Sequence, residues 1–147
     1  MKTKILRKTL LSLGLMFVLG SAITQVRSEE DKVPLITIHS TEETVPWGKA
    51  GSFILSMNPI TFGERYVNFK VSGTAIPGVD YVTLVSPAHI AKSGYGAIVV
   101  QTLPTRRGPG PRLSYSVVVT LEPGPGYVVG EPRSAQMMIK PSSSLGL

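Results

Sequence analysis

Apolar and polar residues alternate with a period of two along most of the chain after residue 32. Phe53, Leu55 and Met57 share one face of the stretch FILSM at 53–57. Because successive side chains of a strand point to opposite faces, this alternation predicts half-buried strands. The longest alternating run has an inward set of Leu113, Tyr115, Val117, Val119 and Leu121. Further strands are predicted at 34–39, 66–71, 80–85, 95–103 and 134–140.

Proline and glycine interrupt the chain between these stretches. Turn residues stand at Pro46 and Gly48, at Pro59, at Pro77-Gly78, at Pro87, at Gly94, within 104–111 and within 123–126. Turns at short intervals between short strands predict an all-β protein, an antiparallel β-sandwich. The stretch LEPGPGYVVG (121–130) predicts a wide loop that carries a short strand. No segment after residue 32 combines the length and the 3.6-residue period of a helix.

The first 28 residues have the layout of a secretory signal peptide. A basic segment (Lys2, Lys4, Arg7 and Lys8) precedes the apolar run from Leu10 to Leu19, and small residues follow it. This run is shorter than the ~20 residues of a membrane span, so the segment would contact a membrane only if left uncleaved. Cleavage after Ala22 or after Ser28 fits, and Ser28 is preferred. The predicted organisation is therefore signal peptide 1–28, charged lead-in 29–32, β-sandwich 33–140 and flexible tail 141–147.

Removing the leader changes the charge of the chain. Five of the 15 basic residues lie within 1–28, which leaves 10 basic against 9 acidic residues. A nearly neutral domain does not offer the basic surface that nucleic acid requires, so no nucleic-acid partner is expected. The chain has no cysteine, so an exported domain of this sequence is held together without disulfides.

The candidate catalytic residues are few and scattered. Two histidines, His39 and His89, form a zinc site only if Asp80 joins them, and scattered surface histidines are the expected arrangement. No nucleophile elbow or phosphate-binding loop is present, so we expect no enzyme and no cofactor. Three arginines, Arg106, Arg107 and Arg112, flank the sequence GPGP in one loop. They form either a docking point for an acidic partner or a solvated loop.

Several short motifs in order resemble the Calx-beta domain family. They are GTA-x-x-G-x-DY from Gly73 to Tyr81, an alternating run that ends at Thr120-Leu121, and the stretch from Gly126-Tyr127 to Gly130. The resemblance covers roughly residues 33–140. It implies an immunoglobulin-like β-sandwich of about seven strands. The family occurs in the regulatory loop of sodium–calcium exchangers and in extracellular adhesive proteins.

The resemblance also implies a calcium site at one end of the sandwich, built from acidic residues of several segments. Of the implied positions, only Asp80 retains its acid. The Glu-Gly position holds Trp47-Gly48, an acidic pair falls around Thr105, Arg106 and Arg107, and a glutamate falls near Ser114 or Tyr115. The terminal aspartates are replaced by Lys140-Pro141-Ser142. Because Ca²⁺ takes six to eight oxygen ligands and cations repel it, this set disfavours calcium.

The sequence therefore favours a non-catalytic exported module, secreted, periplasmic or at the cell surface. Its partner is an unidentified protein or a component of the envelope or matrix, and self-association through strand edges is open. The alternative is a calcium-binding module of the same fold, active in adhesion or cell communication, that uses Asp80 as a metal ligand.

Overall fold

The computed structural model describes residues 33–61, 63–104 and 113–141, and every regular element among them is a strand. The leader, the lead-in, the three loop arginines and the tail beyond Pro141 lie outside these residues. The all-β prediction is confirmed, with ten strands rather than about seven. They are β1 (Leu35–Ser40), β2 (Thr44–Pro46), β3 (Ala50–Asn58), β4 (Arg65–Val67), β5 (Phe69–Ser72), β6 (Ala88–Ile90), β7 (Tyr95–Gln101), β8 (Tyr115–Leu121), β9 (Val128–Val129) and β10 (Ser134–Lys140).

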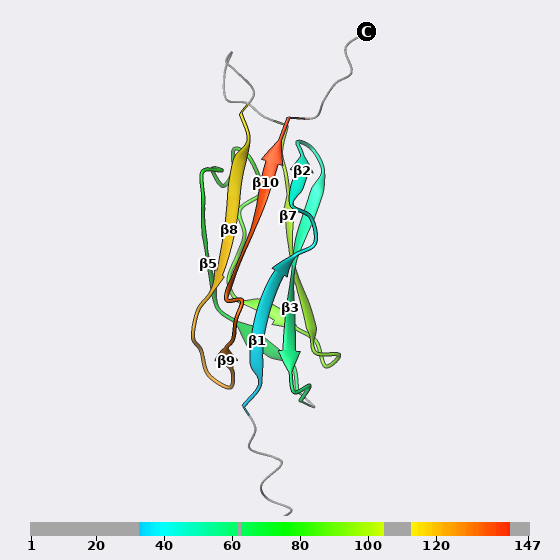
Figure 1. Cartoon of the computed structure of the whole chain (residues 1–147), viewed down its shortest axis with the longest axis vertical. Coiled ribbons are helices and arrows are strands. Elements are labelled where there is room, and N and C mark those ends of the chain that lie inside the picture. Colours follow the sequence, from blue (N-terminus) through cyan, green and yellow to red (C-terminus); the bar gives the residue numbers. More distant parts are fainter. Residues whose placement is uncertain (1–32, 62, 105–112, 142–147) are drawn as a thin grey trace, which may run out of the picture. The chain divides into compact units, whose positions relative to one another are not determined.

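The strands form two sheets (Figure 1). One sheet has the order β4-β6-β7-β3-β1-β9, and the other has the order β2-β10-β8-β5. Most pairs are antiparallel, as in β3 with β7 and β8 with β10. Two pairs, β1 with β9 and β10 with β2, are parallel, so both sheets are mixed and the prediction of an antiparallel sandwich is corrected. These exceptions involve strands of two and three residues, too short to show a period in the sequence.

The core lies between the sheets and follows the alternation of the sequence. Phe53, Leu55 and Met57 of β3 are buried, as are Val117, Val119 and Leu121 of β8. Burial of such side chains contributes roughly 25 cal/mol per Å² of apolar surface, the main stabilisation available to a chain without disulfides. The prediction that Leu113 also faces the core is wrong, because this residue precedes β8 and is exposed.

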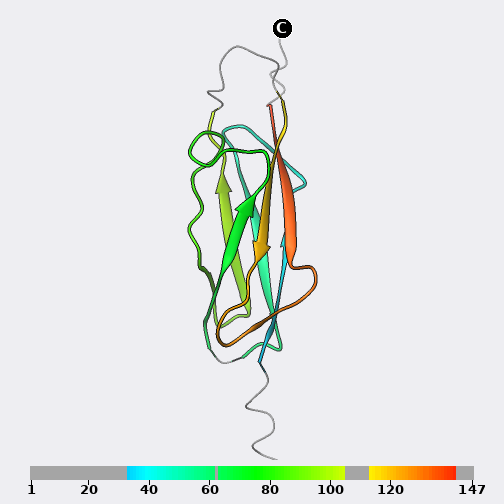
Figure 2. The same cartoon turned by 90° about the vertical axis from the view of Figure 1, so that its left-hand side faces the viewer.

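The stretch YVNFKV was predicted as one strand, and it is divided between the two sheets. β4 ends at Val67 in the six-stranded sheet, and β5 begins at Phe69 in the four-stranded sheet. Both flanking residues are buried because each enters the same core from its own sheet. Asn68 is therefore the point at which the chain passes from one layer to the other. Figure 2 shows β5 (green) beside β8 (gold), which in turn lies beside β10 (orange-red).

Three hydrogen bonds hold this crossover. The Asn68 N–H donates to the Tyr127 hydroxyl (2.9 Å), which donates to the Glu122 carbonyl (2.7 Å). The Glu122 N–H in turn donates to the Asn68 carbonyl (2.8 Å), which closes a ring. Tyr127 is buried, so water does not readily replace its hydroxyl in this ring. The aromatic ring packs in the core while its hydroxyl satisfies backbone groups of two loops.

The predicted strand at 80–85 is wrong. Only Tyr81 forms β-bridges, to Pro77 and Thr102, and the following residues run as an irregular segment to β6. Between the bridge Tyr81–Thr102 and the pair Ile90–Gly96, this segment takes nine residue steps while β7 takes six. A continuous ladder cannot absorb three extra residues, so the segment bows away from β7.

We expect Tyr127→Phe to lower the free energy of unfolding by about 1–3 kcal/mol, because it leaves a backbone donor and a backbone acceptor without their partner. Urea unfolding of the two proteins measures the difference. Tyr95→Phe is the matched control, since the Tyr95 side chain is exposed and its change should stay within about 0.5 kcal/mol. Equal losses for the two variants would contradict a role of the Tyr127 hydroxyl.

Candidate functional site

The stretch GTAIPGVDY (73–81) forms a tight loop after β5. Pro77 and Gly78 occupy the centre of a turn in which the Val79 N–H donates to the Ile76 carbonyl (3.1 Å). Gly78 has a φ of 78°, the value that the third position of a type II turn requires and that glycine adopts without strain. The predicted turn is confirmed.

The first three residues of the stretch dock the loop onto β8. The Thr74 N–H donates to the Ser116 hydroxyl (3.0 Å), and the Thr74 hydroxyl accepts from the Ser116 N–H (2.9 Å). The Ala75 N–H donates to the Ser116 carbonyl (2.9 Å). Gly73 has a φ of 114°, and a Cβ at this position would collide with the Ser116 backbone. The Gly-Thr-Ala order thus has a structural reason that involves no ligand.

Asp80, the predicted metal ligand, is fully buried inside the loop. Its Oδ2 accepts a hydrogen bond from the Ile76 N–H at 2.6 Å. Its own N–H donates to the Ile76 carbonyl (2.8 Å), and its carbonyl accepts from the Leu103 N–H (2.8 Å). A carboxylate that accepts a backbone N–H at this distance forms a charge-assisted bond, so Asp80 holds the loop closed.

Tyr81 follows Asp80 into the core and pairs with Thr102 at the end of β7. Burial raises the pKa of the Tyr81 phenol, and the negative charge of Asp80 raises it further. Both effects favour the neutral phenol. Asp80 and Tyr81 are both buried residues, so neither offers its side chain freely to the surface.

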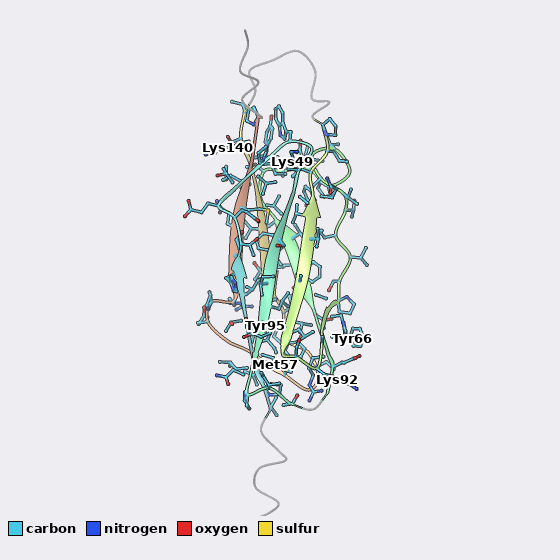
Figure 3. The ribbon with its side chains drawn as sticks, turned by 90° about the vertical axis from the view of Figure 1, so that its right-hand side faces the viewer. Lys49, Met57, Tyr66, Lys92, Tyr95 and Lys140 are labelled. Carbon is cyan, nitrogen blue, oxygen red and sulfur yellow. The ribbon has the colours of Figure 1, made fainter. Side chains whose placement is uncertain are left out.

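Two of the described positions that correspond to the family's other ligands, Trp47 and Lys140, lie close together at one end of the sandwich. Thr102, which pairs with Tyr81, donates its hydroxyl to the Pro46 carbonyl (3.1 Å). The backbone N–H of Trp47 donates to the Lys140 carbonyl (3.0 Å), so this turn contacts the end of β10. Lys49 and Lys140 mark this end in Figure 3. The structure thus gathers segments that the resemblance placed together.

The side chains at these positions do not suit a cation. Trp47 offers an indole N–H, and this buried donor has no hydrogen-bond partner in the structure. A donor cannot coordinate a metal ion, and the lysines add positive charge. Within 33–61, 63–104 and 113–141, no group of three or more histidine, aspartate or glutamate side chains is placed to hold a metal ion.

The two histidines lie apart on the six-stranded sheet. His39 is on β1 and His89 on β6, and three strand spacings, about 14 Å, separate these strands. His89 contacts the Glu64 carboxylate (3.2 Å) and the Tyr66 ring (5.2 Å between centroids). Asp80 is buried in its loop, so the structure does not bring His39, His89 and Asp80 together.

Sequence reasoning missed Thr102, whose hydroxyl links the Trp47 turn to the Asp80 loop. Its signal was a polar residue at the next inward position after Ile98 and Val100, where the strand period leads into the core. Reasoning from the sequence also left the arginines Arg106, Arg107 and Arg112 as a docking point, and these residues lie outside the described parts of the chain. Among the described residues, no helix has the length and the apolar character that crossing a membrane requires.

No protein-family model matches the chain, and no curated protein matches it. Solved structures do resemble it. CBD12 from CALX1.2 matches 73% of this chain and 45% of its own with a TM-score of 0.57 and 14% identity. The apo form of the Calx CBD1 domain matches 72% of this chain and 96% of its own with a TM-score of 0.50 and 15% identity. The chain spans just under half the length of the first structure. At these identities the likeness shows the fold alone: the sandwich is Calx-beta-like.

We expect Asp80→Ala to lower the free energy of unfolding by about 2 kcal/mol, since the Ile76 N–H loses a charged acceptor. Asp80→Asn keeps an acceptor oxygen and should lose less. Urea denaturation measures both variants. Glu43→Ala, at an exposed position, is the control and should change stability by less than about 0.5 kcal/mol. A neutral effect of Asp80→Ala would contradict the structural role of this carboxylate.

Proposed function

We propose that the chain is a Calx-beta-like module that is exported, has no catalytic activity and acts by binding a partner. The site of action is the cell surface, the periplasm or the extracellular space. The partner is a protein or a component of the envelope or matrix. Most of the family's calcium ligands are lost, and the fold is kept as a scaffold.

The observation that carries this proposal is the use of the Asp80 carboxylate inside its own loop. In a calcium site a carboxylate has oxygen atoms directed at the ion, beside several more oxygen ligands. Here Oδ2 is engaged by the Ile76 N–H, and the nearby turn contributes Trp47 in place of an acid. The acid of the signature therefore serves to close the loop, a role that survives the loss of the ion.

The proposed export rests on the sequence of the first 28 residues. A basic segment followed by an apolar run and small residues is recognised by the secretory machinery. The lack of cysteine fits a domain whose stability comes from packing between its two sheets.

We expect the chain to melt at the same temperature in millimolar Ca²⁺ and in chelator. A native site at a hundredfold excess of ion over the dissociation constant would stabilise the fold by about 2.7 kcal/mol. That gain would raise the midpoint by roughly 10 °C. Mg²⁺ at equal concentration controls for general ionic effects. A rise specific to Ca²⁺ that Asp80→Asn removes would support the calcium-binding alternative instead.

We further expect residues 29–147, once immobilised, to retain a component of envelope or matrix fractions saturably. The fragment denatured in urea and then immobilised is the matched control. It exposes more apolar surface than the folded fragment, so non-specific retention would be stronger on it. Retention should also persist in chelator, which separates this function from calcium-dependent adhesion. Reproducible turnover of a substrate by the same fragment would overturn the proposal.

A further inference from the structure

Strand β7 is not paired along the whole of the edge that faces β6. At one end the Val82 N–H donates to the Gln101 carbonyl (2.9 Å). At the other end the Ala91 N–H donates to the Tyr95 carbonyl (3.0 Å), next to the pair Ile90–Gly96. Between these bonds the bowed segment 82–87 stands away from the strand, which leaves an opening in the ladder.

The backbone of Val99 points into this opening. Its neighbour on β3 is Ser52, whose carbonyl accepts from the Thr41 N–H (3.0 Å) and therefore faces β1. In an antiparallel pair the two residues either exchange hydrogen bonds or both face outward, so Val99 directs its N–H and C=O away from β3. The bond from Val82 to Gln101, two residues further along β7, confirms the direction.

No backbone hydrogen bond from residues 33–61, 63–104 or 113–141 reaches Val99 on this side. The opening is the floor of a groove of about 340 Å³. One wall of the groove includes Val82, Leu84, Val85 and Pro87, and the other includes Ala97 and Val99. Val85 is 81% exposed and Val99 is 57% exposed, so the groove opens to solvent. Figure 3 shows the irregular segment running beside β7.

The charge of the groove defines what complements it. Its lining contains no lysine, arginine, aspartate or glutamate. His89 at its margin is the single titratable side chain of the lining, and it contacts Glu64. The polar groups on its floor are the backbone N–H and C=O of Val99, which carry a partial positive and a partial negative charge. An extended peptide residue presents the same two groups in the opposite order.

We propose that this groove binds a short, extended, uncharged peptide segment of a partner protein. One residue of that segment exchanges two backbone hydrogen bonds with Val99, as in strand addition to a sheet. Its neighbouring apolar side chains pack on Val82, Val85 and Ala97. The groove begins beside the Asp80 loop, at Val82 and Gln101, and follows β7 toward His89. The proposal rests on the proposed function of the chain as an interaction module.

Amide hydrogen exchange of the full chain tests the opening without any ligand. The Val99 amide should exchange at least about a hundredfold faster than the Val100 amide, whose N–H faces β3 and lies within the ladder. Equal protection of the two amides would overturn the proposal, because Val99 would then already have a partner.

The binding test uses the capped peptide acetyl-Thr-Val-Thr-Val-Thr-amide and the ¹⁵N-labelled full chain. We expect saturable shifts of the amides of Ala97, Val99 and Val82, with a dissociation constant of about 1 mM. Two further peptides carry N-methyl groups on the threonines or on the valines. Because one edge of a strand presents the N–H groups of alternate residues, one methylated peptide should bind about tenfold more weakly and the other nearly as well. Equal binding of both, or loss of both, would overturn pairing with Val99.

Val99→Pro removes the N–H that faces the groove and leaves the hydrogen bonds to β3 intact. It should therefore weaken the binding of the unmethylated peptide about tenfold. Val99→Thr keeps the N–H and is the matched control. If Val99→Pro does not fold, the methylated peptides and the exchange rates decide alone. If the peptide causes no shifts at all, the groove is not a peptide site, even where the chain still retains an envelope component. Loss of that retention with intact peptide binding would overturn only the proposed function.

Discussion

The passage of the chain between layers at Asn68 is the constraint on which the rest of the sandwich depends. One residue separates a strand of one sheet from a strand of the other, so its backbone cannot join either ladder without help. The Tyr127 hydroxyl and the Glu122 backbone supply the missing partners. This ring fixes where β5 begins, and β5 leads directly into the loop that contains Asp80. The position of the candidate site is thus a consequence of the crossover.

The alternation of apolar residues predicted the long strands well, since β3 and β8 carry an uninterrupted period of two and bury one face each. It failed at 80–85, where the same kind of residues follow Tyr81 without forming a strand. The cause is that this segment and β7 have different numbers of residues between their two points of pairing. This difference depends on both segments, so it cannot be seen in the sequence of either one alone. The short strand expected within 121–130 is present as β9. The short strands β2 and β6 were missed for a related reason, because a strand of three residues is defined by its partner and shows no period.

The candidate site shows a similar division between what the sequence records and what it does not. The turn at Pro77-Gly78 could be predicted because proline and glycine restrict the backbone locally. The identity of Asp80 could be read from the signature, but its hydrogen bond to Ile76 could not. A carboxylate that closes a loop and one that also binds an ion have the same place in the sequence. The neighbours that distinguish them come from 47–48, 102 and 140, which only folding brings together.

The lengths of the edge strands have a further consequence. The outermost strands are β4 and β9 in one sheet and β2 and β5 in the other, and none exceeds four residues. The strands of six to nine residues all lie inside the sheets. Sheet edges this short give a second molecule little to extend, which opposes the growth of neighbouring copies into fibrils. The opening at Val99 is closed by backbone hydrogen bonds at both of its ends, so it too is shorter than the edge that another folded sheet would need for pairing.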